Sequence, residues 1–139
     1  MTEAVLDASV VLKWFARSNE RRRAQARRLR EEYVSGHLVI VVPSLLFLEI
    51  LNVAGRRWGW DEPTLQQLTI SLQDLRFEVS EPELASVAAW VARGLTAYDA
   101  AYVALAEAIT DGGAPLLTAD ARLARAAGDH TELRVLLAE

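Results

Sequence analysis

The stretch Leu38-Val39-Ile40-Val41-Val42 decides the fold, because it is an unbroken run of five apolar residues, four of them β-branched. β-Branched side chains favour extended backbone. A run without polar alternation suits a parallel strand that is covered on both faces better than an edge strand with one face in water. The sequence around this stretch should therefore alternate helices with further buried strands.

Such an alternation is expected from end to end. Four other segments are expected to be strands: residues 4–6, 77–79, 115–118 and 133–137. Helices are expected after Ser9, over residues 20–34, 44–58, 61–75 and 80–93, from Thr96 onward, and over residues 120–127. With no repeat or linker between them, these elements predict one α/β domain over residues 1–139, with a mainly parallel sheet and helices on both faces.

Several helix ends carry recognisable signals. Ser9 is a plausible N-cap of the first helix, and Gly36 supplies a left-handed end to the helix before it. The stretch Ser80-Glu81-Pro82-Glu83 and the pair Thr96 and Asp99 both have the spacing of a capping box. These signals predict where helices begin, and they also offer structural roles for some of the acidic residues.

Composition limits the chemistry that is open to the chain. At 139 residues and 52% hydrophobic content, it can bury a core without disulfides. It has no cysteine and two histidines, His37 and His130, so thiolate zinc sites and cysteine nucleophiles are excluded. A catalytic metal would have to be held by oxygen atoms.

The amino terminus and the net charge predict the protein's surroundings. Residues 1–4 carry an acid where a secretory signal would carry a base, and no apolar run reaches the ~18 residues that a membrane span needs. We therefore expect a soluble, cytoplasmic protein. Because 19 acids outnumber 15 bases, the net charge of −4 does not attract nucleic acid to the molecule as a whole.

Four carboxylates, Asp7, Glu49, Asp99 and Asp120, each stand where an apolar segment ends or is interrupted. Asp7 and Asp120 follow the first and fourth expected strands, so right-handed crossovers place both at one edge of the sheet. Two carboxylates ~5 Å apart at an effective dielectric of ~20 repel by roughly 3 kcal/mol. If all four converge, they favour a hard cation such as Mg²⁺.

Each acid also has a purely structural interpretation. Glu49 lies at i, i+3 and i+7 with Asn52 and Arg56, which is a polar stripe on a helix. Asp99 suits a helix cap, and Asp120 suits the amino end of a helix dipole. Asp7, directly after a buried strand, needs hydrogen bonds, a cation or open water. The metal-site hypothesis depends on the set rather than on any one member.

Four fragments in this order resemble a known family. They are Asp7-Ala8-Ser9 after the first strand, Pro43 with Glu49 in an apolar helix, Tyr98-Asp99-Ala100-Ala101-Tyr102, and Thr118-Ala119-Asp120 after a strand. Together they resemble a PIN domain, specifically a VapC-type toxin of a type II toxin-antitoxin system. The resemblance covers essentially the whole chain.

The resemblance implies a fold, an activity and partners. The fold would be a three-layer α/β/α sandwich with a five-stranded parallel sheet, and the activity a Mg²⁺- or Mn²⁺-dependent endoribonuclease. Asp7, Glu49, Asp99 and Asp120 would coordinate metal, with Ser9 and Thr118 as polar neighbours. A metal-activated water would attack the phosphate in line, leaving a 5′-phosphate and a 3′-hydroxyl. The family also implies a homodimer and a cognate antitoxin that occludes the site.

Seven arginines fall between residues 17 and 30 against one acid, Glu20. On a helix, Arg17, Arg21 and Arg28 share one face. They are candidates for contacts with RNA phosphates or with an acidic stretch of the antitoxin. A solvated helix whose long side chains cover apolar surface is the equally simple alternative.

Other functions remain open at this point. A phosphoacceptor signalling domain would use a lysine late in the chain, but the only lysine is Lys13. A haloacid dehalogenase-type phosphotransferase would show Asp-x-Asp after the first strand, where this chain has Ser9. A non-catalytic RNA- or protein-binding module, in which the acids are only caps and surface charges, is the remaining alternative.

Overall fold

A five-stranded sheet lies at the centre of the fold, with strand order β3-β2-β1-β4-β5. The computed structural model describes residues 2–16, 23–109, 114–128 and 133–135. Every strand pairing is parallel. The strands are β1 (Thr2–Leu6), β2 (Leu38–Val42), β3 (Glu78–Val79), β4 (Leu116–Thr118) and β5 (Leu133–Val135). The expected α/β class and five-stranded parallel sheet are confirmed.

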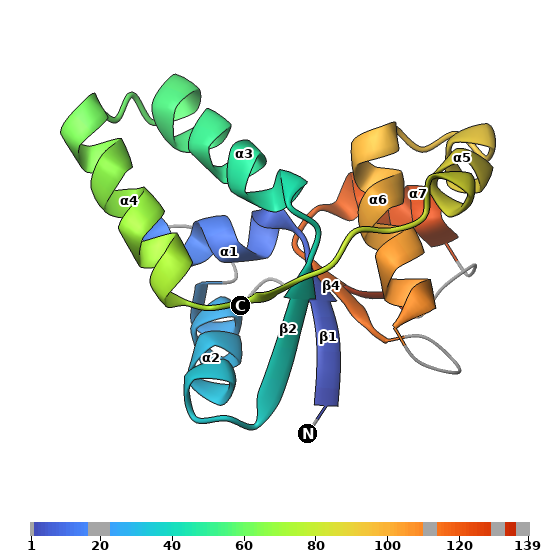
Figure 1. Cartoon of the computed structure of the whole chain (residues 1–139), viewed down its shortest axis with the longest axis horizontal. Coiled ribbons are helices and arrows are strands. Elements are labelled where there is room, and N and C mark those ends of the chain that lie inside the picture. Colours follow the sequence, from blue (N-terminus) through green and yellow to red (C-terminus); the bar gives the residue numbers. More distant parts are fainter. Residues whose placement is uncertain (1, 17–22, 110–113, 129–132, 136–139) are drawn as a thin grey trace.

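Helices cover both faces of this sheet. They are α1 (Ala8–Phe15), α2 (Arg23–Val34), α3 (Leu45–Asn52), the π-helical η1 (Val53–Arg57), α4 (Glu62–Asp74), α5 (Leu84–Ala92), α6 (Ala97–Ala108) and α7 (Ala121–Ala127). Figure 1 shows α1 to α4 on one side of the strands and α5 to α7 on the other. This is the expected three-layer α/β/α sandwich. Among the described residues, no helix combines the length and the apolar character that crossing a membrane requires.

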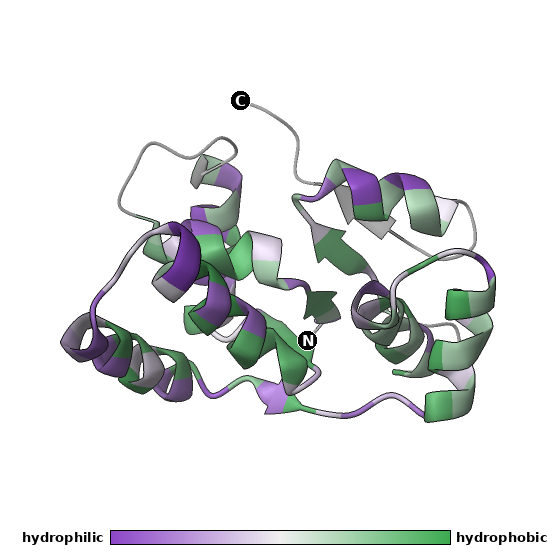
Figure 2. Cartoon of the chain, turned by 90° about the horizontal axis from the view of Figure 1, so that it is seen from above, coloured by the Kyte–Doolittle hydropathy of each residue, from purple (hydrophilic) through white to green (hydrophobic). Residues whose placement is uncertain are grey.

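The core is built on the two strands that the sequence marked as apolar runs. In β1 and β2, Val5, Leu6, Ile40 and Val42 are fully buried. Figure 2 shows these hydrophobic strands between the two helical layers. Burial on both faces is what the unbroken run Leu38–Val42 predicted, and it leaves the sheet's carboxyl edge as the place for polar chemistry.

That edge contains the topological switch point, where the order of successive strands across the sheet reverses. The neighbouring strands β1 and β4 send the chain into opposite helical layers, through α1 and α7 respectively. Ligands of open α/β sheets bind at such a switch point. Because Leu6 pairs with Leu117, the residues that follow, Asp7 and Thr118, lie side by side there.

Two helix starts agree with the sequence. Asp61 caps α4 by accepting a hydrogen bond from the Thr64 N–H at 3.1 Å. Thr96 caps α6 by accepting one from the Asp99 N–H at the same distance. In both cases the side-chain oxygen satisfies a backbone donor that the first helical turn leaves unpaired.

Two other predicted caps are wrong. The N-cap of α1 is Asp7 rather than Ser9. The predicted capping box at residues 80–83 does not form: α5 starts at Leu84, and within the described residues its cap, Glu83, makes no side-chain capping bond. The Ser80 N–H, which Glu83 would accept from in such a box, donates instead to the Val42 carbonyl at 3.0 Å, so a long-range backbone contact replaces the local one.

The predicted helix over residues 44–58 forms in two parts. It continues from α3 into the π-helical turn η1, where Gly55 faces α4. A Cβ at Gly55 would meet Leu65 Cδ1 at 3.4 Å, which is ordinary contact distance, so the glycine permits close packing without being required by backbone angle. The helix predicted over residues 20–34 is described from Arg23 onward, and Arg17 and Arg21 lie outside the described residues.

Candidate functional site

Asp7 is the most buried of the four predicted acids, with 5% of its surface exposed. Its Oδ1 accepts hydrogen bonds from the Ser9 N–H at 3.1 Å and from Ser9 Oγ at 2.5 Å. Its Oδ2 accepts one from Thr118 Oγ1 at 2.6 Å. Groups from α1 and β4 therefore fix both carboxylate oxygens.

Ser9 and Thr118, predicted as polar neighbours, also anchor the turn that carries Asp120. The Ala119 N–H donates to Ser9 Oγ, and the Asp120 N–H donates to Thr118 Oγ1, both at 2.9 Å. The two hydroxyls thus connect the end of β1 with the end of β4 across the switch point. This network sets the position of Asp120 relative to Asp7.

Burial raises the pKa of Asp7 to about 6, from an ordinary value of 3.8. The hydrogen bonds from Ser9 and Thr118 work against this increase, and the negative charge of Asp120 adds to it. A carboxylate in this state is stabilised by either a proton or a cation. The structure therefore places beside Asp120 an acid that is costly to leave ionised without a positive partner.

Glu49 does not belong to the polar stripe that its helical spacing allowed. Asn52 and Arg56 are exposed, whereas Glu49 is partly buried and its Oε1 accepts a hydrogen bond from the Tyr102 hydroxyl on α6. Burial raises the pKa of Glu49, the hydrogen bond from Tyr102 lowers it, and the charge of Asp99 raises it again. Glu49 is thus directed across the site toward α6.

Tyr102 is a residue whose role the sequence did not reveal, although it lay in one of the family fragments. It is fully buried, and its oxygen also accepts a hydrogen bond from the backbone of Ala8. Burial and the charge of Glu49 raise its pKa, so it stays a hydrogen-bond donor. Its spacing of three residues from Asp99, on one helical face, was the available signal.

Asp99 and Asp120 each take part in the hydrogen bonding of a helix start, and each also faces the candidate site. Asp99 contributes the backbone N–H that Thr96 caps, and Asp120 is the N-cap of α7, accepting from the Arg122 N–H at 2.9 Å. Their side chains nevertheless point to one cation. Arg122 Nη1 lies 2.9 Å from Asp99 Oδ2, and Nη2 lies 3.3 Å from Asp120 Oδ2.

Arg122 is the second residue that sequence reasoning missed. Its hydrogen bond and ion pair with Asp99, followed by the charge of Asp120, raise the pKa of the guanidinium. The signal was the basic residue two positions after a candidate ligand, at the start of a helix. A lone arginine beside an acid is usually only a surface ion pair, so this spacing by itself does not indicate a role.

The four acids are therefore linked around one region, but they do not form a finished metal cage. Asp7 and Asp120 influence each other electrostatically, as do Glu49 and Asp99, and Arg122 joins Asp99 to Asp120. With the side chains in the positions that the structure gives them, no three acidic or imidazole groups among the described residues are close enough to share one metal ion. Mutual repulsion and the bridging guanidinium account for this spacing.

The donor set fits a hard divalent ion all the same. Every candidate donor is an oxygen, from four carboxylates and the hydroxyls of Ser9 and Thr118, as Mg²⁺ and Mn²⁺ prefer. The Asp120 side chain is 32% exposed, so it has room to rotate. Asp7, Glu49, Asp99 and Asp120 are the residues that would hold such an ion.

Arg28 is the one predicted RNA or partner contact that lies within the described residues. Arg28 is exposed on α2, and His37 is exposed beside Ser35, whose hydroxyl lies 2.8 Å from His37 Nδ1. Arg17, Arg21 and His130 lie outside the described residues.

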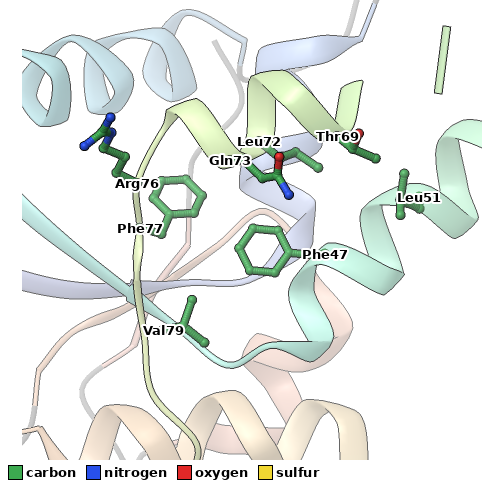
Figure 3. Close-up of a pocket in the computed structure, with 8 residues that line it drawn as sticks. All are labelled: Phe47, Leu51, Thr69, Leu72, Gln73, Arg76, Phe77 and Val79. Atoms are coloured by element: carbon green, nitrogen blue, oxygen red, sulfur yellow. The ribbon is translucent and has the colours of Figure 1, made fainter. Parts of the chain in front are cut away.

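A separate groove of about 480 Å³ opens between α3, α4 and β3 (Figure 3). It is mainly apolar and contains none of the four acids. The lining residues are Phe47, Leu51, Thr69, Leu72, Gln73, Arg76, Phe77 and Val79. The groove is therefore distinct from the candidate metal site.

Comparison with known proteins agrees with this arrangement. The sequence model of the PIN domain family matches residues 4–129. The chain belongs to the PIN domain family. The chain is also similar to the crystal structure of PAE2754 from Pyrobaculum aerophilum, with a TM-score of 0.62 and 25% sequence identity over 95% of this chain and 90% of that one. None of the curated proteins compared with the chain matches it.

Membership of the PIN family gives the acidic edge a general chemical meaning. PIN domains are typically nucleases, and these nucleases generally use divalent metal ions. The oxygen donors gathered at the switch point of this PIN domain are consistent with that chemistry.

Proposed function

We propose that this PIN domain is a metal-dependent endoribonuclease of the VapC toxin type, which hydrolyses RNA phosphodiester bonds at Asp7, Glu49, Asp99 and Asp120. The observation that carries the proposal is the network at the switch point, where Thr118 holds Asp7 at 2.6 Å and also accepts from the Asp120 N–H. RNA, rather than DNA, follows from the likeness of the four sequence fragments to VapC-type toxins.

The residues divide the work by their surroundings. Asp7 is the anchoring ligand, because three hydrogen bonds hold it in one orientation. Glu49, which Tyr102 holds through one carboxylate oxygen, is suited to orienting the attacking water. Asp99 and Asp120 form a pair of carboxylates that Arg122 bridges. When bound, a divalent ion supplies Lewis-acid stabilisation of the phosphate and lowers the pKa of water.

The proposal predicts that the purified protein cleaves RNA in millimolar Mg²⁺ or Mn²⁺ and stops in excess EDTA. The reason is that the acids alone supply no positive charge to stabilise the phosphoryl transition state. Incubation with total cellular RNA, followed by chemical mapping of the new ends, should find 5′-phosphate and 3′-hydroxyl termini.

The matched control is Asp7→Asn, purified in parallel, which excludes a contaminating ribonuclease. Cleavage that persists in EDTA, or ends that carry a 2′,3′-cyclic phosphate, would show that the metal mechanism is wrong.

We further propose a homodimer and a cognate antitoxin that covers the acidic edge. The likeness to VapC-type toxins supports both. Large apolar side chains that are exposed in the single chain, such as Leu48 at 70% and Leu84 at 85%, are compatible with a protein partner. Arg28 remains a candidate contact for RNA or for an acidic stretch of the antitoxin.

Tyr102→Phe is expected to lower the cleavage rate about tenfold and to raise the Mg²⁺ concentration needed for half-maximal rate by a similar factor. Partners that orient a metal ligand typically contribute 10- to 100-fold to metal affinity or activity. The substitution keeps the buried ring and removes only the hydroxyl that holds Glu49. Initial rates measured against Mg²⁺ concentration test this.

Tyr98→Phe is the matched control, since Tyr98 lies on the same helix but is 66% exposed. Wild-type rates and wild-type metal dependence in Tyr102→Phe would exclude a positioning role.

A further inference from the structure

Arg122 brings a positive charge into the acidic site from within the chain. It lies in the first turn of α7, two residues after Asp120, and bridges Asp99 Oδ2 at 2.9 Å and Asp120 Oδ2 at 3.3 Å. These two acids come from different segments, the start of α6 and the end of β4. The guanidinium therefore does at this point what a bound cation would do.

Apart from Asp99 and Asp120, the surroundings of Arg122 are unfavourable for a cation. The amino end of a helix carries a partial positive charge, which disfavours a basic side chain there. Arg122 is thus held mainly by Asp99 and Asp120 rather than by its own helix. Its side chain is 61% exposed, so it can leave for solvent without any change in the core.

A metal ion would compete for the same oxygens. Asp99 Oδ2 and Asp120 Oδ2 are the atoms that face the guanidinium, and the two acids are also half of the proposed ligand set. An oxygen that accepts from Arg122 is less available to a divalent ion, and two cations so close would repel each other. Arg122 and a metal ion are therefore alternative partners of the Asp99 and Asp120 carboxylates.

We propose that Arg122 is a built-in cation that neutralises Asp99 and Asp120 until a divalent metal ion displaces it. This inference rests on the proposed metal-dependent function, and it concerns the regulation of that same site. Arg122 keeps the metal-free site from collecting four unbalanced charges, and it sets the metal concentration at which the site becomes occupied.

The test is metal affinity in the absence of RNA. Binding of Mg²⁺ and Mn²⁺ to the full chain is measured by calorimetry at fixed ionic strength for wild type, Arg122→Gln and Arg125→Gln. Loss of two ion pairs made by an exposed arginine changes a binding constant by about three- to tenfold, so Arg122→Gln should bind metal tighter by that factor. Arg125 lies on the last turn of the same helix and controls for the loss of one positive charge.

A second readout follows the guanidinium itself. In wild type, the Arg122 Nε–H signal, assigned by its disappearance in Arg122→Gln, should shift with Mg²⁺ at the concentration that calorimetry gives for binding. The signal of Arg125 should not follow this titration.

The outcomes separate this inference from the proposed function. If wild type binds metal and Arg122→Gln binds no tighter, or if Arg125→Gln tightens binding equally, the displacement proposal is overturned. Weaker RNA binding in Arg122→Gln with unchanged metal affinity would also overturn it, and would make Arg122 a phosphate contact. If neither wild type nor Arg122→Gln binds metal at millimolar concentration, the proposed function itself fails.

Discussion

Asp7→Asn is expected to reduce metal-dependent RNA cleavage by at least about a thousandfold, because a metal site supplies several kcal/mol of transition-state stabilisation and each 1.36 kcal/mol is tenfold in rate. Asp7 is the acid with the most completely fixed side chain, through Ser9 and Thr118. Replacing one of its oxygens by an amide nitrogen removes both the negative charge and a possible metal ligand.

The fold should survive this change. The asparagine oxygen can still accept from Ser9, and its amide can donate to Thr118 Oγ1, with the Thr118 hydroxyl turned toward Ser9 Oγ, which lies 3.4 Å away. Every buried polar group then keeps a partner. The loss of activity should therefore come without the loss of the cooperative unfolding transition.

The measurement is the single-turnover cleavage rate at saturating Mg²⁺, with circular dichroism as the check on folding. Asp74→Asn is the matched control, because it makes the same chemical change at an exposed acid at the end of α4. A rate for Asp7→Asn within tenfold of wild type would remove Asp7 from the proposed ligand set.

The sequence was sufficient for the parts of the site that depend on connectivity. Asp7 and Asp120 follow adjacent parallel strands, and the crossover rule places such residues at one edge without knowledge of any side chain. Strands β1, β2 and β4 were likewise predictable, because an apolar run such as Leu38–Val42 is favourable only where both faces are buried, whereas β3 is exposed and this argument does not apply to it.

The sequence was insufficient where two layers meet. The hydrogen bond between Glu49 and Tyr102 joins residues 53 positions apart, and neither residue's helical spacing implies the other. Local spacing instead favoured the stripe of Glu49 with Asn52 and Arg56. The capping box at residues 80–83 failed for the same reason, since the Ser80 N–H bonds to Val42 on the neighbouring strand, a contact that depends on tertiary packing.

Asp7→Asn should also raise the free energy of unfolding of the metal-free protein at pH 8 by up to about 3 kcal/mol, because a pKa displaced from 3.8 to about 6 costs the ionised folded state that much. Below pH 3.8 Asp7 is protonated in both the folded and the unfolded state, so it does not lower the free energy of unfolding. Between these values the folded state binds more protons than the unfolded state, so wild-type stability falls as pH rises. Above pH 6 the loss is complete.

Urea unfolding at pH 4 and pH 8 in EDTA tests this prediction. Wild type should lose stability between the two values, and Asp7→Asn should lose less. Glu49→Gln is the comparison, because burial raises the pKa of Glu49 in the same direction but Glu49 is less buried. An equal loss in wild type and Asp7→Asn would mean that Asp7 is not the group responsible.

Magnesium should reverse the order of the two proteins. A ligand that binds only the folded state stabilises it by RT ln(1 + [L]/Kd), so saturating Mg²⁺ should restore stability to wild type at pH 8 and give little to Asp7→Asn. The same buried charge would then weaken the metal-free fold and strengthen the metal-bound one. A destabilising carboxylate held rigidly by Ser9 and Thr118 is what a site selected for binding a cation, rather than for stability, is expected to contain.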